Sequence, residues 1–162
     1  MTDAAEVHRL LLARGATVAV AESLTGGLLG AALTTTPGAS ATFRGGFIVY
    51  ATDLKAAVAG VPQPLLDAEG PVSAHVAAAL AAGARDRLFA TYGVGVTGVA
   101  GPDEQNGQPV GTVHVAIAGP GSVPGSAGEV RSLLLSGDRD AIRSGAVDAA
   151  LTLIAETVAR HG

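Results

Sequence analysis

The stretch Thr17-Val-Ala-Val-Ala-Glu-Ser-Leu-Thr-Gly-Gly27 joins a short apolar run to a glycine-rich turn. Residues 17–21 have the length and composition of a buried strand. The leucine-rich residues 26–34 that follow have the spacing of a helix. A strand that turns directly into a helix is the repeating unit of α/β proteins. Here it would place Ser23 on exposed backbone, beside the free N–H groups of a helix start.

The rest of the chain first alternates helices with strands and then places three strands in succession. The last two strands are expected to form a hairpin across the flexible connection Gly119–Gly128. The order predicts an α/β fold, a three-layer α/β/α sandwich with a mixed sheet of about five strands. Caps, turns and apolar spacing predict the further elements. The strands are expected at Gly45–Tyr50, Tyr92–Thr97, Val110–Ala118 and Glu129–Leu135. The helices are expected from Asp3 and Glu6 to Ala13, at 52–59, at Ala74–Leu88, and from Asp138 or Asp140 to about Arg160.

Composition predicts a single globular domain over residues 1–162 and argues against several classes of function. Hydrophobic residues make up 48% of the chain and charged residues 15%, which favours a packed core over disorder. The formal net charge is −4, basic residues do not cluster and aromatic residues are only 3%, so no nucleic-acid partner is expected. Neither a signal peptide nor a membrane-spanning run is recognisable, so we expect a cytoplasmic protein without a membrane partner.

Metal and dinucleotide sites find little support in the sequence. Cysteine is absent and the four histidines are scattered without ligand spacing. The carboxylates of Asp103 and Glu104 stand as an isolated pair, so we assign no metal and no cofactor. The segment Gly93-Val-Gly-Val-Thr-Gly98 matches the pattern G-x-G-x-x-G, but it overlaps an expected strand and no helix start follows it. A dinucleotide site is therefore disfavoured.

Two roles fit Ser23. Taken alone, a serine in front of a helix is most simply an N-cap. However, Glu22, Ser23 and Thr25 share one turn in which a single cap would suffice, and the two glycines that follow let a ligand approach the backbone. In the second role, the N–H groups of residues 26–28 hold a phosphate or an oxyanion beside a reactive Ser23.

Further polar residues fall where a shared pocket is expected. Ligands of open α/β sheets bind beyond the carboxyl ends of the strands, and Ser23, Tyr50 and Thr97 all stand at such ends. Lys55 follows in a chain whose other basic residues are arginines. It is either a solvated helix lysine or a desolvated base, because lysine can lose its proton and arginine cannot. The Tyr50 hydroxyl would orient Ser23 or relay a proton.

Arg139 lies at the start of the last expected helix, between two aspartates. It would either pair with Asp138 or Asp140, or clamp an anionic group of a substrate.

Several separated motifs give the chain a resemblance to the CinA C-terminal domain family, including its stand-alone PncC-like nicotinamide-mononucleotide amidohydrolases. The resemblance runs from about Leu10 to Leu153. The motifs that carry it are Ala21-Glu-Ser-Leu-Thr-Gly-Gly27, Thr36-Pro-Gly-Ala-Ser40, Gly46-Phe-Ile-Val-Tyr50 with Lys55, Gly70-Pro-Val-Ser73, Thr97-Gly-Val-Ala-Gly-Pro102, Pro109-Val-Gly-Thr112 and Gly137-Asp-Arg-Asp140.

The resemblance implies the three-layer fold and hydrolysis of a nicotinamide carboxamide to the acid and ammonia, without a cofactor. It implies that Ser23 is the nucleophile, Lys55 its base and Tyr50 an assisting group. A small-molecule nucleotide is then the expected partner. A homodimer or higher homo-oligomer is also expected, with which an apolar, alanine-rich helix surface is compatible. The substrate-binding positions would be Thr25, Gly26, Gly27, Thr97, Gly98 and Arg139.

Two alternatives to this activity stay open at the level of sequence. One is a non-catalytic nucleotide-binding module, regulatory in competence or DNA-damage responses. The other is an amidase or peptidase that uses the same Ser–Lys pair on a different amide.

Overall fold

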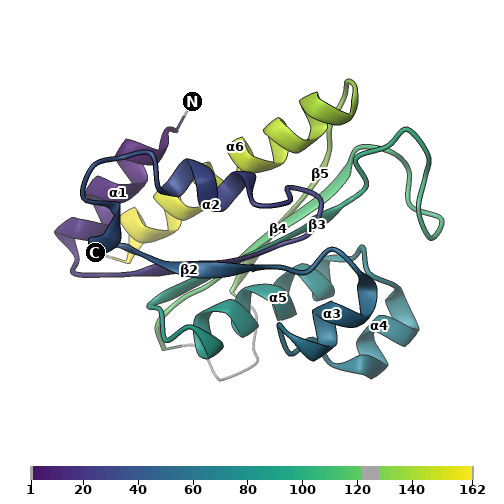
Figure 1. Ribbon diagram of the computed structural model, residues 1–162, viewed down its shortest axis with the longest axis horizontal. Coiled ribbons are helices and arrows are strands. Elements are labelled where there is room, and N and C mark those ends of the chain that lie inside the picture. The colour runs from purple at the N-terminus through teal and green to yellow at the C-terminus, as the bar shows by residue number, and fades with distance from the viewer. Residues whose placement is uncertain (1, 122–127, 162) are drawn as a thin grey trace.

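The computed structural model describes residues 2–121 and 128–161 and has the expected α/β fold, with helices on both faces of a mixed five-stranded sheet (Figure 1). The strand order is β2-β1-β3-β4-β5, with β1 parallel to β2 and β3, and β4 antiparallel to β3 and β5. The strands are β1 Val18–Glu22, β2 Phe43–Ile48, β3 Tyr92–Gly98, β4 Thr112–Ala118 and β5 Glu129–Leu134. The helices are α1 Ala4–Ala13, α2 Leu28–Leu33, α3 Thr52–Ala57, α4 Gln63–Glu69, α5 Ala74–Arg87 and α6 Arg139–Arg160, with a 3₁₀ turn at Ala39–Ala41.

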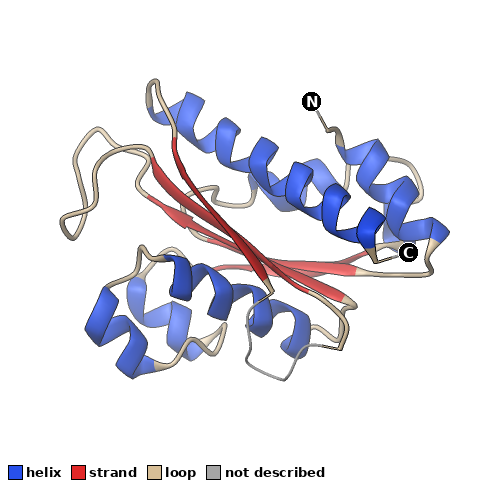
Figure 2. Cartoon of the chain, turned by 180° about the vertical axis from the view of Figure 1, so that it is seen from behind, coloured by secondary structure: helices blue, strands red, loops and turns tan. Residues whose placement is uncertain are grey.

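The helices divide into two layers, which Figure 2 shows from behind. Helices α1, α2 and α6 cover one side of the sheet, called here the α6 face; α3, α4 and α5 cover the other, called here the α5 face. Side chains alternate along β1 because successive residues of a strand point to opposite faces. Val18 and Val20 pack in the core of the α6 face, whereas Ala19 and Ala21 pack in that of the α5 face.

Glycines in β3 let α5 lie very close to the sheet. A Cβ atom added to Gly93 would come within 2.0 Å of the Ala81 carbonyl oxygen, and one added to Gly95 within 2.2 Å of the Ala77 carbonyl oxygen. The pattern Gly93–Gly98 therefore lies inside a buried strand and serves helix packing, because no side chain fits between the two backbones. This accounts for a G-x-G-x-x-G match outside a strand-to-helix turn.

Some element boundaries differ from the expected ones for local reasons. Helix α2 begins at Leu28 instead of Gly26, because Gly26 and Gly27 have φ angles of 58° and 104°, in the left-handed region that ends a regular helix. Strand β2 ends at Ile48, two residues before Tyr50, and the chain then turns into α3. The Asp3 and Ser73 caps of α1 and α5 are confirmed, and Asp138 rather than Asp140 caps α6.

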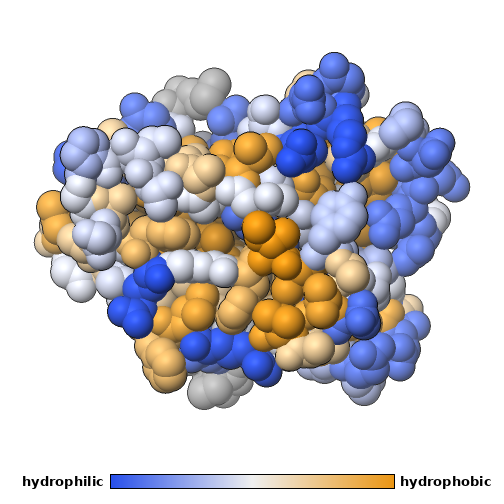
Figure 3. Space-filling model, in the orientation of Figure 1, coloured by the Kyte–Doolittle hydropathy of each residue, from blue (hydrophilic) through white to orange (hydrophobic). Residues whose placement is uncertain are grey.

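The alanines of α5 are used inside the chain. Five of them, at positions 77, 78, 81, 82 and 84, are buried, so they pack against the sheet and do not form a surface patch. Figure 3 shows apolar side chains gathered instead over β2 and α3, where Ile48 and Leu54 are exposed. The homo-oligomer itself stays a prediction.

Residues 122–127 of the expected flexible connection lie outside the described residues. Within the described ranges, no helix is both long and apolar enough to span a bilayer.

Replacing Gly95 with alanine tests the close contact between β3 and α5. Gly95→Ala should lower the free energy of unfolding by about 2–3 kcal/mol, because the new methyl group overlaps the Ala77 carbonyl. Urea denaturation measures this loss. Gly30→Ala, inside α2, is the matched control: its nearest neighbour would be a Glu22 oxygen at 3.4 Å, so it should leave stability unchanged or raised. Equal stabilities for the two variants would contradict the packing argument.

Candidate active site

Ser23 stands directly after β1, where the alternation of the strand decides which side it faces. Glu22 points to the α6 face with Val20, so Ser23 points to the α5 face with Ala21. Its N–H donates to the Val96 carbonyl oxygen at 3.0 Å, which ties the turn to β3. Ser23 is only 7% exposed, so the expectation of an exposed serine is wrong. Lys55 and the walls of a small cavity cover it.

Lys55, the only lysine of the chain, reaches Ser23 from α3. Its Nζ donates to the Ser23 Oγ at 2.9 Å, to the Val49 carbonyl oxygen at 2.8 Å and to the Tyr50 carbonyl oxygen at 3.1 Å. The residue is 1% exposed, and within residues 2–121 and 128–161 no carboxylate forms a salt bridge with it. Burial therefore lowers the pKa of Lys55 from 10.5 to about 8.

The three hydrogen-bond partners of Lys55 differ in kind, and this difference sets the direction in which a proton can pass between Ser23 and Lys55. The carbonyl oxygens of Val49 and Tyr50 can only accept hydrogen bonds, so they hold the two N–H bonds of a neutral amine. The lone pair of that amine then points at the third partner, the Ser23 hydroxyl, which can donate. Ser23 and Lys55 thus form a hydrogen-bonded pair whose geometry would let a neutral lysine take the serine proton.

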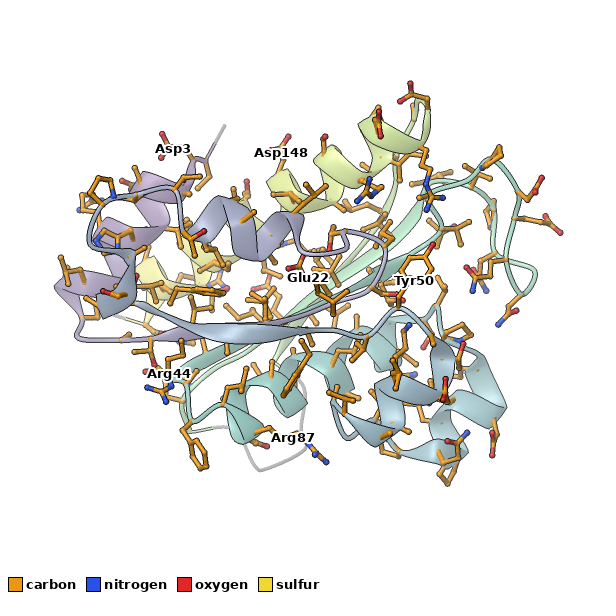
Figure 4. The ribbon with its side chains drawn as sticks, in the orientation of Figure 1. Asp3, Glu22, Arg44, Tyr50, Arg87 and Asp148 are labelled. Atoms are coloured by element: carbon orange, nitrogen blue, oxygen red, sulfur yellow. The ribbon has the colours of Figure 1, made fainter. Side chains whose placement is uncertain are left out.

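A cavity of about 180 Å³ opens in front of this pair, beyond the carboxyl ends of β1 and β3. It brings together six of the sequence-predicted site residues: Ser23, Tyr50, Lys55, Thr97, Gly98 and Arg139. Figure 4 shows Tyr50 beyond the end of β2. The remaining lining residues are Leu24, Pro71, Val72, Val99, Ala100, Gly101, Asp103, Glu104 and Gln105.

Arg139, the first residue of α6, joins two walls of the cavity. Its Nη1 donates to the Gly101 carbonyl oxygen at 2.6 Å and its Nη2 to the Tyr50 hydroxyl at 3.1 Å. The alternative pairing with its neighbours is not seen in the described part of the chain, where Asp138 instead caps the Ala141 N–H. Because the Tyr50 oxygen accepts from Arg139, its own proton is free to be donated to a ligand.

Thr97 and Gly98 form the floor of the cavity at the end of β3. The Thr97 hydroxyl donates to the Pro71 carbonyl oxygen at 2.8 Å, so towards a ligand it can act only as an acceptor. A Cβ atom at Gly98 would lie 2.5 Å from the Thr112 carbonyl oxygen, so the neighbouring strand β4 leaves no room for a side chain there.

Thr25, Gly26 and Gly27 are not brought to the cavity. The Gly26 N–H donates to the Ser23 carbonyl oxygen and the Leu28 N–H to the Thr25 carbonyl oxygen. These N–H groups close the turn upon itself, so the expected anion cradle over residues 26–28 is wrong for both of them. Of the three glycines expected to bind the substrate, Gly98 is the one that lines the cavity.

Two charged residues support the Ser23 turn through contacts that the sequence did not predict. The Glu22 carboxylate accepts hydrogen bonds from the Leu29 and Gly30 N–H groups at the start of α2. Arg143, one turn after Arg139 on α6, donates from Nε to the Leu24 carbonyl oxygen at 2.9 Å. A charged residue at the end of a buried strand was the only signal for Glu22, and nothing in the local sequence pointed to Arg143.

Comparisons with known proteins agree on one family. The model of the CinA C-terminal domain matches residues 2–158. A "CinA-like protein" of Frankia casuarinae is 56% identical over 151 residues, which are 93% of this chain and 34% of that protein. A "putative competence-damage inducible protein" of Geobacillus kaustophilus is 50% identical over 80% of this chain and 30% of its own length. The chain belongs to the CinA C-terminal domain family. It spans about a third of the length of these curated relatives.

Solved structures of similar length share the fold of this CinA domain. A CinA superfamily protein from Klebsiella pneumoniae has a TM-score of 0.89 at 29% identity, over 97% of this chain and 96% of the other. The competence/damage inducible protein CihA from Agrobacterium tumefaciens has a TM-score of 0.82 at 33% identity, over 92% and 93%. These likenesses confirm the three-layer arrangement with a mixed sheet.

Within its described residues, the CinA domain has no group of three or more His, Cys, Asp or Glu side chains that could hold a metal ion. Asp103 and Glu104 lie at the cavity wall, and both are exposed.

The lowered pKa of Lys55 should make the stability of the CinA domain depend on pH in one direction. Between about pH 8 and pH 10 the unfolded chain holds a proton on Lys55 that the folded chain has lost, so stability rises with pH. Relative to Lys55→Met, the wild type should gain roughly 1.4 kcal/mol per pH unit in this window and nothing below it. Urea denaturation of both proteins from pH 6 to 10 measures the difference. A difference independent of pH would mean that the lysine is not desolvated.

Proposed function

We propose that this CinA domain hydrolyses the carboxamide of nicotinamide mononucleotide to nicotinate mononucleotide and ammonia, through an ester on Ser23. The observation that carries the proposal is the 2.9 Å hydrogen bond between a buried Lys55 amine and the Ser23 hydroxyl, at the inner end of a cavity. A lysine with a pKa of about 8 is partly neutral near neutral pH and can act as a general base. The resemblance to nicotinamide-mononucleotide amidohydrolases supplies the substrate.

The first half of the reaction forms the ester. Neutral Lys55 takes the Ser23 proton while the serine oxygen attacks the carboxamide carbon, which gives a tetrahedral intermediate. Backbone N–H groups at Leu24 and Gly98, which both line the cavity, are the proposed donors to the oxyanion. Protonated Lys55 then gives its proton to the departing amide nitrogen, which leaves as ammonia. The C–N bond breaks as the acyl ester remains on Ser23.

The second half repeats the sequence with water. Lys55, neutral again, takes a proton from a water molecule whose oxygen attacks the ester carbon. When this intermediate collapses, Lys55 returns the proton to Ser23 and the carboxylic acid leaves as its anion. Tyr50, oriented as a donor by Arg139, is proposed to hold the substrate at the cavity mouth. Arg139 is the proposed clamp for the phosphate, because its guanidinium already reaches the cavity.

Ammonia release from nicotinamide mononucleotide tests the assignment. Ser23→Ala and Lys55→Arg should each lower kcat/KM by at least about 10³-fold, the first by removing the nucleophile and the second because arginine keeps its proton. Glu6→Gln, on an exposed part of α1, is the control and should retain the wild-type rate. Ammonia release that is equally fast in the Ser23 variant would disprove the ester mechanism.

The same assay separates the two alternatives left open by the sequence. A non-catalytic nucleotide-binding module would bind the mononucleotide in calorimetry without releasing ammonia. An amidase for another amide would act equally well on free nicotinamide, its riboside and the mononucleotide, whereas a phosphate clamp at Arg139 favours the last of these.

The pH dependence of kcat/KM should follow the protonation of Lys55. Activity should rise with pH and level off above about pH 8, because only the neutral amine can accept the Ser23 proton. The CinA domain has a single lysine, so ¹³C labelling of the lysine ε-carbon gives one side-chain signal whose titration can be compared with the rate profile. An NMR titration near the usual lysine value, with activity already constant at pH 7, would exclude Lys55 as the base.

A further inference from the structure

We propose that Glu22 is a positioning residue that holds Ser23 against Lys55 from the opposite face of the sheet. One Glu22 oxygen accepts the Leu29 N–H at 2.9 Å and the other accepts the Gly30 N–H at 3.0 Å. Each carboxylate oxygen thus binds one of the first N–H groups of α2. The end of β1 and the start of α2 are clamped together, with the Ser23 turn closed between them.

The turn inside this clamp has little freedom. Besides its two internal hydrogen bonds, at Gly26 and Leu28, it is anchored at its first residue, where the Ser23 N–H donates to Val96. Arg143 holds the Leu24 carbonyl oxygen from α6. These contacts fix the backbone of the turn, and in the described part of the chain the Glu22 side chain makes the hydrogen bonds that tie β1 to α2. The position of the Ser23 hydroxyl therefore depends on the clamp.

The buried position of Glu22 makes it hard for another residue to take over its role. It is 2% exposed, and in residues 2–121 and 128–161 no lysine, arginine or histidine forms a salt bridge with it. The N–H groups of α2 are its described hydrogen-bond donors, and a helix start favours negative charge. The helix start that looked like an anion site in the sequence is thus occupied by a carboxylate of the chain itself.

A glutamine at this position would break the clamp with little change of shape. Its carbonyl oxygen can still accept one N–H, but its NH₂ group would face the other N–H, donor against donor. We expect the start of α2 to move away from β1 and the Ser23 hydroxyl to leave the Lys55 amine. Displacements of about 1 Å in a reacting group can cost about a hundredfold in rate.

The decisive experiment combines kinetics with a crystal structure of Glu22→Gln. The kinetic arm rests on the proposed function: kcat for ammonia release should fall at least about 30-fold, whereas KM should change less than about threefold, because Glu22 does not line the cavity. The structural arm does not depend on any substrate. The distance between the Ser23 Oγ and the Lys55 Nζ should exceed about 3.5 Å in the variant.

Asp3→Asn is the matched control, because Asp3 is another carboxylate that caps a helix of the same face. Its loss of stability, measured as a change in Tm, should come without a loss of kcat. If Glu22→Gln kept the wild-type kcat, or lost it only in proportion to the fraction of unfolded protein, the positioning role would be disproved.

Failure of the positioning role of Glu22 can be told apart from failure of the proposed function. A wild type that releases no ammonia would refute the proposed function, while the Ser23–Lys55 distance in the two crystal structures would still decide the role of Glu22. An unchanged distance in the variant overturns the positioning role. Should Glu22→Gln fail to fold, Glu22→Asp, which is one methylene shorter and cannot reach both N–H groups, is measured against the same criteria.

Discussion

The amine of Lys55 is held in the interior by two carbonyl oxygens and one hydroxyl, and burial keeps its pKa near 8. Desolvating a charged amine costs free energy, so the site stores an unfavourable interaction that the rest of the fold must compensate. The two carbonyls come from Val49 and Tyr50, in the turn between β2 and α3. The chain must leave the sheet after Ile48 in order to present both of them to the lysine.

The rest of the architecture keeps this site rigid. Parallel strands β1 and β3 end side by side, so that Ser23 and Thr97 reach the same cavity. Glycines in β3 let α5 lie almost directly on the sheet, which gives the α5 face a dense layer with few large side chains. The first turns of α6 contribute two arginines: Arg139 joins the cavity walls, and Arg143 holds the turn of the nucleophile. Long-range contacts thus converge on a few residues at one end of the sheet.

Local sequence predicted much of the fold, because its signals are local. The caps at Asp3 and Ser73, the apolar strands and the hairpin of β4 and β5 follow from patterns within a few residues. Boundaries failed where the backbone leaves regular geometry, as after Ile48, where the chain turns towards α3 before Tyr50, and at Gly26, whose backbone is left-handed. The sequence also predicted part of the candidate site. Because Ser23, Tyr50 and Thr97 follow or end strands, they were expected in one pocket, and all three line the cavity.

The sequence by itself thus determined the α/β class, the order of the elements, the edge of the sheet where the cavity lies and the residue types available there. Only the tertiary structure decided that Lys55 meets Ser23 in a buried setting, that Arg139 binds Tyr50 and Gly101, and that Glu22 fills the helix start. The physical reason is that burial and hydrogen-bond partners are set by segments far apart in the chain. A residue's pKa and its contacts depend on those partners, whereas its tendency to form a helix or a strand is largely local.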